Sequence, residues 1–135
     1  VAHDSRDLAR VLARGAAQSV DAWYMPAGAA LWNDTDSVIA MMSKTGKPVL
    51  YDRTARVRDG GLMAYEPRLV DPVRIWASQL LLILQGVDAA SIPIELPSHF
   101  ELALNLDEAA KSDRLRPSGA LLERVDVFVS RTASR

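Results

Sequence analysis

Residues that could carry chemistry are few and widely spaced in this sequence. The two histidines, His3 and His99, lie far apart, and neither has a neighbour at a spacing typical of a metal site. The chain contains no Cys, which excludes a thiolate metal cage, a disulfide framework and a Cys nucleophile. The phosphate loop G-x-x-x-x-G-K-[ST], the dinucleotide fingerprint G-x-G-x-x-G and the nucleophile elbow G-x-S-x-G are also absent. We therefore expect no catalysed reaction, no metal and no cofactor.

Aromatic side chains near predicted strand ends are better candidates for a ligand site. Trp32 lies in the loop after a predicted strand. There its ring could form a flat apolar wall for a small molecule, or it could cover the edge of the core. Tyr51 ends a second predicted strand, directly before Asp52. Both residues would therefore lie at the edge of a sheet where ligands bind.

Charged residues follow the second predicted strand. Asp52 could bind an ammonium or hydroxyl group of a ligand, or it could cap the next turn. The planar guanidinium groups of Arg53, Arg56 and Arg58 are suited to carboxylate recognition. A solvated charged loop is the better explanation for at least two of these three arginines.

The elements that must position these residues alternate between helix and strand. Hydrophobic periodicity and turn residues predict helices at 4–18, 34–46, 71–86 and 107–114, and strands at 20–26, 47–51, 62–65 and 100–106. Residues 121–129 fit either a helix or a strand. The alternation predicts an α/β domain with a mainly parallel sheet flanked by helices. Ligands of such sheets bind in loops at the carboxyl ends of strands, which here are 27–33, 52–58 and 66–71.

The composition fits one folded domain or one lobe of a larger protein. The chain has 135 residues, of which 49% are hydrophobic, and a formal net charge of −1. A near-zero charge argues against a nucleic-acid partner, whose binding surface would be strongly basic. The longest apolar run, residues 80–84, is too short to span a bilayer, which needs about 20 apolar residues. We expect no signal peptide within this chain, because charged residues interrupt its beginning.

The predicted helix 72–85 has very little polar surface. We expect Asp71 to cap it and Pro72 to occupy its first position. Apolar residues then leave little polar face beside Arg74 and Gln79. A helix that is apolar all round needs burial on several sides, which one small lobe can hardly provide. We therefore expect a partner surface for this helix, from another domain or another subunit.

Several segments resemble one known family in the same order along the chain. The matching segments are VDAWYMP (20–26), KPVLY (47–51), GGLMAYEP (60–67), LQG (84–86), IPIELP (92–97) and FELALNL (100–106), and residues 117–126 match its tail. Over residues 15–130 the chain resembles the ABC transporter substrate-binding proteins of the tryptophan/tyrosine-binding type. That family has the type I periplasmic-binding-protein fold.

The resemblance implies that the chain is the carboxyl-terminal part of a two-lobed clamp. Its implied parts are a partial second lobe (1–70), a crossover helix and return segment that pack on a missing first lobe or another chain (71–97), a return to the second lobe (98–130) and a frayed tail (131–135). It implies a non-catalytic protein that binds a small solute, aromatic or amino-acid-like, for an ABC permease or a membrane sensor. The implied location is periplasmic, or extracellular as for a lipoprotein.

The resemblance and the predicted loops together give six candidate ligand-binding residues. They are Ala27, Gly28, Trp32, Tyr51, Asp52 and Tyr65. Trp32 would stack on the ligand, Asp52 would accept hydrogen bonds, and Tyr65 would line the hinge side. Ala27 and Gly28 would contribute backbone groups.

The chain departs from the family in the loop after the first matching strand. Where the family often has polar Asp-Asn or Ser/Thr residues, residues 27–30 read Ala-Gly-Ala-Ala, and Ala64 and Glu66 replace a Ser and a Gly. An unpaired polar group on a bound solute costs about 1–3 kcal/mol. These changes favour the hypothesis of a flatter, more apolar or aromatic ligand.

Two other functions stay open at this point. The chain could be a ligand-sensing or dimerising module of the same fold that associates through helix 72–85 and binds no solute. It could also be a small α/β enzyme with an unrecognised site, although the missing motifs count against a reaction.

Overall fold

The structure is a computed structural model that describes residues 5–17, 19–26, 34–111, 113 and 116–130. Its contacts divide the chain into two compact units. Unit 1 comprises residues 1–65 and 102–135, and unit 2 comprises residues 66–101. The two units are described separately below.

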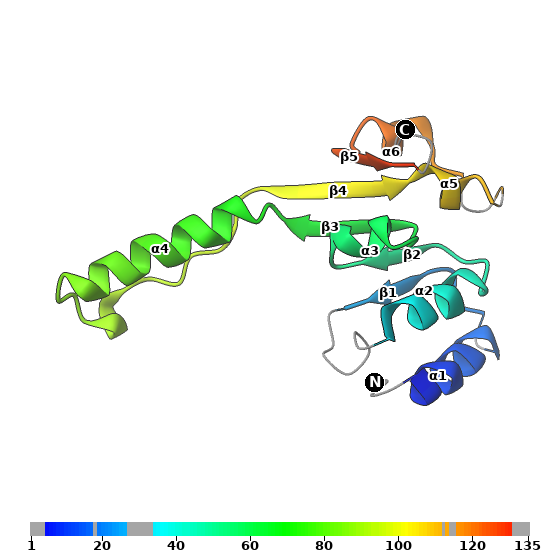
Figure 1. Cartoon of the computed structure of the whole chain (residues 1–135), viewed down its shortest axis with the longest axis horizontal. Coiled ribbons are helices and arrows are strands. Elements are labelled where there is room, and N and C mark those ends of the chain that lie inside the picture. Colours follow the sequence, from blue (N-terminus) through cyan, green and yellow to red (C-terminus); the bar gives the residue numbers. More distant parts are fainter. Residues whose placement is uncertain (1–4, 18, 27–33, 112, 114–115, 131–135) are drawn as a thin grey trace. The chain divides into compact units, whose positions relative to one another are not determined.

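A five-stranded sheet has the strand order β1-β2-β3-β4-β5 (Figure 1). Its strands are β1 (Trp23–Met25), β2 (Val49–Tyr51), β3 (Met63–Pro67), β4 (Phe100–Asn105) and β5 (Val127–Val129). The pairs β1–β2, β2–β3 and β4–β5 are parallel. Strands β3 and β4 run in opposite directions, because the N–H of Asn105 bonds to Leu62 whereas the N–H of Arg68 bonds to His99. The prediction of a mainly parallel sheet flanked by helices is confirmed.

Three helices of unit 1 pack on one face of this sheet. They are α1 (Ser5–Ala17), α2 (Thr35–Ser43) and α3 (Thr54–Arg58). The main core joins Leu8 of α1, Val38 and Met42 of α2 and Val57 of α3 to the buried face of the strands. Side chains alternate between the two faces of a strand, so every second strand residue enters this core. The face that the helices cover therefore holds most of the buried apolar area.

The opposite face of the sheet carries a smaller core and several exposed rings. Leu62, Leu104 and Ala109 form that second cluster, beside the short helices α5 (Leu106–Ala109) and α6 (Gly119–Leu122). Tyr24 of β1 is 63% exposed and Phe128 of β5 is also exposed. Among the described residues, this face is thus the less completely covered of the two.

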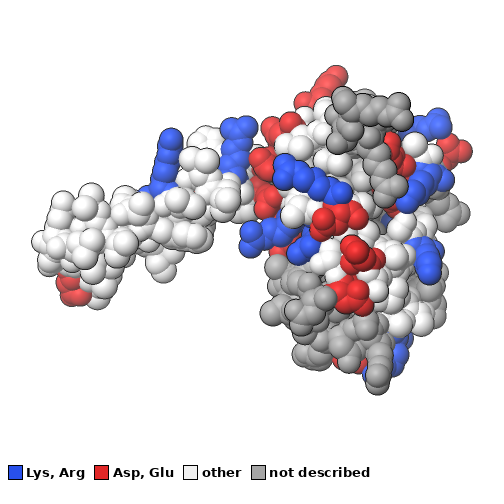
Figure 2. Space-filling model, in the orientation of Figure 1, with Lys and Arg blue, Asp and Glu red and all other residues white. Residues whose placement is uncertain are grey.

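Unit 2 consists of one long helix and an extended return segment. Helix α4 (Val70–Leu84) leads through Gly86, which has a positive φ of 91°, to the short 3-10 helix η2 (Ala89–Ser91). Glycine tolerates this left-handed backbone without a side-chain clash, so the helix stops there. None of the 15 residues of α4 is buried. In Figure 2 most of the surface of unit 2 is white, with a few blue and red side chains among the uncharged residues.

The start of α4 differs from the expectation. The helix begins at Val70 with Leu69 in the N-cap position, so Asp71 lies inside the first turn and is not the cap. Its carboxylate is instead bonded to His99. A tertiary contact has therefore replaced the local capping bond that the sequence pattern predicted.

Most other predicted elements form near the positions that their patterns indicated, but the predicted helix 107–114 is the four-residue α5, which ends at Ala109. The ambiguous segment 121–129 divides into the end of α6 and strand β5, and the charged loop after β2 contains α3. No helix in the described part of the chain has both the length and the hydropathy that a bilayer crossing requires.

Candidate functional site

The carboxyl ends of β1, β2 and β3 lie at one edge of the sheet. Parallel pairing places Met25 beside Tyr51, and Tyr51 beside Ala64. Met25, Tyr51 and Ala64 therefore lie side by side across the three strands, and ligands of parallel sheets bind towards the carboxyl ends of such strands. Asp52 directly follows the end of β2, whereas Tyr65 follows Ala64 within β3, two residues before that strand ends.

Tyr51 is buried in the main core of unit 1. Its side chain is 1% exposed, and a Cβ at Gly61 would lie 2.6 Å from the Cε2 atom of its ring. Desolvation, followed by the negative charge of Glu108, raises the pKa of the Tyr51 hydroxyl above the ordinary tyrosine value. The hydroxyl is therefore neutral at physiological pH, and the packed ring anchors the end of β2 from which Asp52 projects.

Tyr65 has the opposite environment. It is 51% exposed on β3, whereas its neighbour Ala64 is fully buried on the other face. Asp52 is half-buried at the end of β2. Of the described candidates, these two side chains offer an aromatic ring and a carboxylate within reach of solvent. Ala27, Gly28 and Trp32 lie outside the described residues.

Arg56 connects this edge to the beginning of α2. Its Nη1 atom donates to Thr35 Oγ1 at 3.0 Å and to Asp59 Oδ2 at 2.9 Å. Thr35 is the first residue of α2 and follows the predicted ligand loop 27–33. Of the three arginines that could have recognised a carboxylate, Arg56 therefore has a positioning role within unit 1.

The cavity beneath the sheet in unit 1 is too small for a solute. It has a volume of about 10 Å³ and is lined by residues that include Ser43, Tyr51, Gly61 and Glu108. Ser43 Oγ donates to Glu108 Oε1 at 2.5 Å, and Lys111 forms an ion pair with the same carboxylate. The sequence pattern predicted only a helix that begins at residue 107, and burial of the Glu108 carboxylate depends on tertiary packing that no local spacing reveals.

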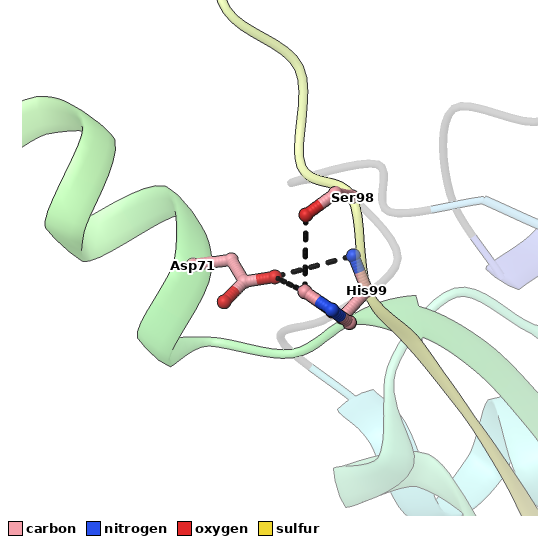
Figure 3. Close-up of polar contacts among 3 residues, drawn as sticks. All are labelled: Asp71, Ser98 and His99. Atoms are coloured by element: carbon pink, nitrogen blue, oxygen red, sulfur yellow. Dashed lines mark hydrogen bonds and ion pairs between the residues drawn. The ribbon is translucent and has the colours of Figure 1, made fainter.

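A second polar cluster that the sequence analysis did not find lies within unit 2. Asp71, Ser98 and His99 are joined by hydrogen bonds (Figure 3). His99 looked isolated because its partner Asp71 is 28 positions away in the chain. Among the described residues, no group of three or more His, Cys, Asp or Glu side chains could hold a metal ion.

Three solved structures align with 93% of this chain. A conserved domain protein from Vibrio cholerae shares 18% identity at a TM-score of 0.74. An ABC domain in complex with L-Trp from Streptococcus pneumonia shares 18% identity at 0.73. A substrate-binding protein with adhesive properties from Clostridium difficile, in its ligand-free, open form, shares 16% identity at 0.61. The chain therefore shares its fold with part of each of these three proteins.

The likeness is one of fold, and it covers only part of the matched proteins. The alignments span 42%, 43% and 41% of the three solved chains, so this chain corresponds to less than half of their length. No protein-family profile matches the sequence, and no curated protein matches it.

Proposed function

We propose that this chain is part of the solute-binding component of an ABC-type importer. The observation that carries the proposal is the convergence of three parallel strand ends at one edge, in a chain with the fold of substrate-binding protein domains. Ligands of open parallel sheets bind at such an edge. In this proposal the protein catalyses no reaction.

The proposed ligand is a small aromatic or amino-acid-like molecule. Tyr65 supplies an exposed ring, and Asp52 supplies a carboxylate that can accept hydrogen bonds. The loop 27–33 would add backbone groups and the Trp32 ring. One of the matched structures, from Streptococcus, holds L-Trp, which supports an aromatic solute as the first compound to test.

The proposed mechanism is closure of a clamp over the solute. Unit 1 would form one wall of the site, and further polypeptide of the kind present in the longer matched structures would form the other. A solute that contacts both walls stabilises the closed state and shifts the equilibrium towards it. A membrane permease, or a membrane sensor, would bind the closed state. In this proposal the protein is periplasmic, or extracellular as for a lipoprotein.

Ligand binding can be tested directly by calorimetric titration and thermal unfolding of a two-lobed protein in which this chain is joined to the further polypeptide that forms the other wall of the site. The compounds are L-tryptophan, L-tyrosine and flat aromatic acids, with L-alanine as the apolar non-aromatic comparison. A ligand at 100 times its Kd adds about 2.7 kcal/mol of stability, which raises the Tm by several degrees.

Matched variants locate the site. Trp32→Ala and Asp52→Asn should weaken binding at least tenfold, whereas Trp76→Ala and Asp88→Asn in unit 2 should leave it unchanged. The proposal fails if no aromatic compound binds, or if the unit 2 variants weaken binding as much as the unit 1 variants do.

The exposed face of α4 favours a second candidate function, association of two copies of this chain. Five residues at alternating spacings of three and four fall on one face of the helix, and all are exposed: Val70, Val73, Ala77, Leu80 and Leu84. The return segment lies along another side, where Gln79 donates to Pro93 at 3.1 Å. This spacing is that of a helix–helix seam, so a second α4 is a suitable partner.

The oligomeric state tests this candidate. Sedimentation of the wild-type chain should show a dimer, and Leu80→Glu should convert it to a monomer because a carboxylate cannot be buried in the seam. Tyr24→Glu, which places the same charge on the exposed sheet face of unit 1, should leave the dimer intact. A monomeric wild-type chain would refute self-association and leave the α4 face for a different polypeptide.

A further inference from the structure

A cavity lies between α4 and the return segment, and all of its lining belongs to unit 2. It has a volume of about 360 Å³, whereas the cavity beneath the sheet of unit 1 has about 10 Å³. Four residues of α4 and five residues of the range 89–95 form the lining. Small-molecule sites in proteins have volumes of about 300–1,000 Å³, so this cavity is large enough for one small organic molecule.

Hydrogen bonds within unit 2 hold the two walls of this cavity together. Gln79 Nε2 of α4 donates to the carbonyl oxygen of Pro93 in the return segment at 3.1 Å. Asp88 accepts the N–H of Ala90 at 3.1 Å and thereby caps the short helix η2. The ring of Pro93 also fixes its own backbone φ. The walls are therefore formed in the absence of a ligand, which lowers the entropy cost of binding one.

The lining is mostly apolar and includes one indole ring. Its four isoleucines are Ile75, Ile83, Ile92 and Ile94. Side chains that branch at Cβ have few rotamers, so these walls keep their shape. Trp76 is 63% exposed, and its ring is therefore available to a ligand. Aromatic rings pack favourably on one another, so the cavity suits a ligand with an aromatic body.

The charge of the cavity is negative. Glu95 is the one charged residue of the lining, and residues 75–97 contain Asp88 and Glu95 but no Lys or Arg. Asp88 caps η2, whereas no basic side chain among the described residues forms an ion pair with Glu95. A carboxylate and an indole ring both attract an ammonium group. The lining therefore favours a cation over an anion.

We propose that this cavity binds a small organic cation with an aromatic body, of the arylalkylammonium class. The ring of the ligand packs against Trp76 and the isoleucines, and Glu95 attracts its ammonium group. This site goes beyond the proposed solute binding and does not depend on it, because its lining lies within unit 2. It also differs from the helix–helix seam, because Val73, Leu80 and Leu84 are not part of the lining.

An NMR titration of the full chain with 2-phenylethylammonium tests the site. The chain has three Trp residues, and Trp76→Phe identifies the indole N–H signal that belongs to Trp76. That signal should shift in a saturable way in the wild-type chain. 3-Phenylpropionate carries a carboxylate in place of the ammonium and should bind roughly tenfold more weakly. n-Butylammonium keeps the charge of a lysine side chain without a ring and should bind roughly fivefold more weakly.

Two matched variants test the charge of Glu95. Glu95→Gln keeps the shape of the side chain and should weaken binding of 2-phenylethylammonium roughly fivefold. Asp88→Asn removes a negative charge from the same part of unit 2 outside the lining, and it should change the Kd by less than about twofold because solvent screens a more distant charge. Both positions are exposed, so neither substitution disturbs a packed core.

Several outcomes would overturn the proposal. The cation site is refuted if the Trp76 signal does not move, if 3-phenylpropionate binds as tightly as the cation, or if Asp88→Asn weakens binding as much as Glu95→Gln. Equal affinity for n-butylammonium would refute the aromatic class of ligand. Asp52→Asn, which alters the proposed solute site of unit 1, should leave binding of the cation unchanged. An equal loss in Asp52→Asn and Glu95→Gln would refute the location in unit 2.

Discussion

Unit 1 and α4 of unit 2 are both rich in apolar residues, but they place them in opposite environments. Leu104 in unit 1 is 2% exposed, whereas Leu80 and Leu84 in α4 are 57% and 75% exposed. The difference arises because strands and helices of unit 1 cover one another, whereas within unit 2 the partner of α4 is an extended return segment. The number of apolar residues in a segment therefore predicts that its surface needs a partner. Whether the side chains are buried depends on the tertiary packing around that segment.

The largest expected effect comes from removing a core side chain. Leu104→Ala should lower the free energy of unfolding by about 3 kcal/mol, because it loses transfer energy and leaves a cavity. Leu80→Ala removes the same atoms from an exposed site and should change the free energy by less than about 0.5 kcal/mol in the monomer. Urea denaturation of dilute protein measures both, and equal losses would contradict the contrast between the two regions.

Substitution of a glycine by alanine should give the next largest difference in unfolding free energy between the two units. A Cβ at Gly61 would lie 2.6 Å from the Tyr51 ring and 2.8 Å from the carbonyl oxygen of Arg56, so Gly61→Ala should cost about 1–3 kcal/mol. At Gly86 in unit 2 no atom lies within 4 Å, and only the positive φ opposes a side chain, at about 1 kcal/mol. Gly119→Ala meets neither obstacle and is the neutral control in the same denaturation series.

Capping residues test the two regions at a finer scale. Asn105 is buried, accepts from the N–H of Glu108 at 3.0 Å and donates to Val57 at 3.2 Å. Asn105→Ala should therefore cost about 2 kcal/mol. Asp88 makes a similar cap in exposed surroundings, and Asp88→Ala should cost about 0.5 kcal/mol by thermal unfolding. A larger loss at Asp88 than at Asn105 would reverse the expected order.

The smallest expected effect is the loss of stability at alkaline pH that the buried Tyr51 hydroxyl causes. Burial raises the pKa of Tyr51 in the folded state, so folding favours the neutral phenol. Its contribution is complete below the ordinary tyrosine pKa of about 10 and is lost as the pH rises above that value. Unit 2 contains no Tyr. Stability should fall between pH 10 and 12 in wild type, and Tyr51→Phe should flatten that decline; an unchanged slope would contradict the assignment.

Most of the fold could be predicted from local patterns. The apolar segments at Trp23, Val49 and Phe100 form strands. Two of the four helix patterns end at a Gly, and Gly46 and Gly86 both adopt a positive φ just after the helices α2 and α4. Local signals were weakest where tertiary contacts compete with them. Asp71 bonds to His99 and does not cap α4. Residues 121–129 form the end of α6 and strand β5, and neither element could be predicted because a four-residue helix and a three-residue strand are too short to show a period.

The candidate site was harder to predict than the fold. Tyr51 and Tyr65 both end or approach the ends of strands, yet one is buried and the other exposed. In a sheet with a core on both faces, alternation along a strand does not reveal which side reaches solvent. The pairing of Asp71 with His99 depends on two segments that become neighbours only after the chain has passed through α4.

The antiparallel course of β3 and β4 has a consequence for how such chains change in evolution. The polypeptide leaves the sheet along β3 and returns along the adjacent strand, with the N–H of Arg68 already bonded to His99. A segment whose two ends meet in this way can be lengthened, shortened or exchanged without shifting the strands on either side. The segment 66–101 can therefore differ in length between related domains. A short turn between β3 and β4 could replace it, and a different inserted structure could occupy the same place.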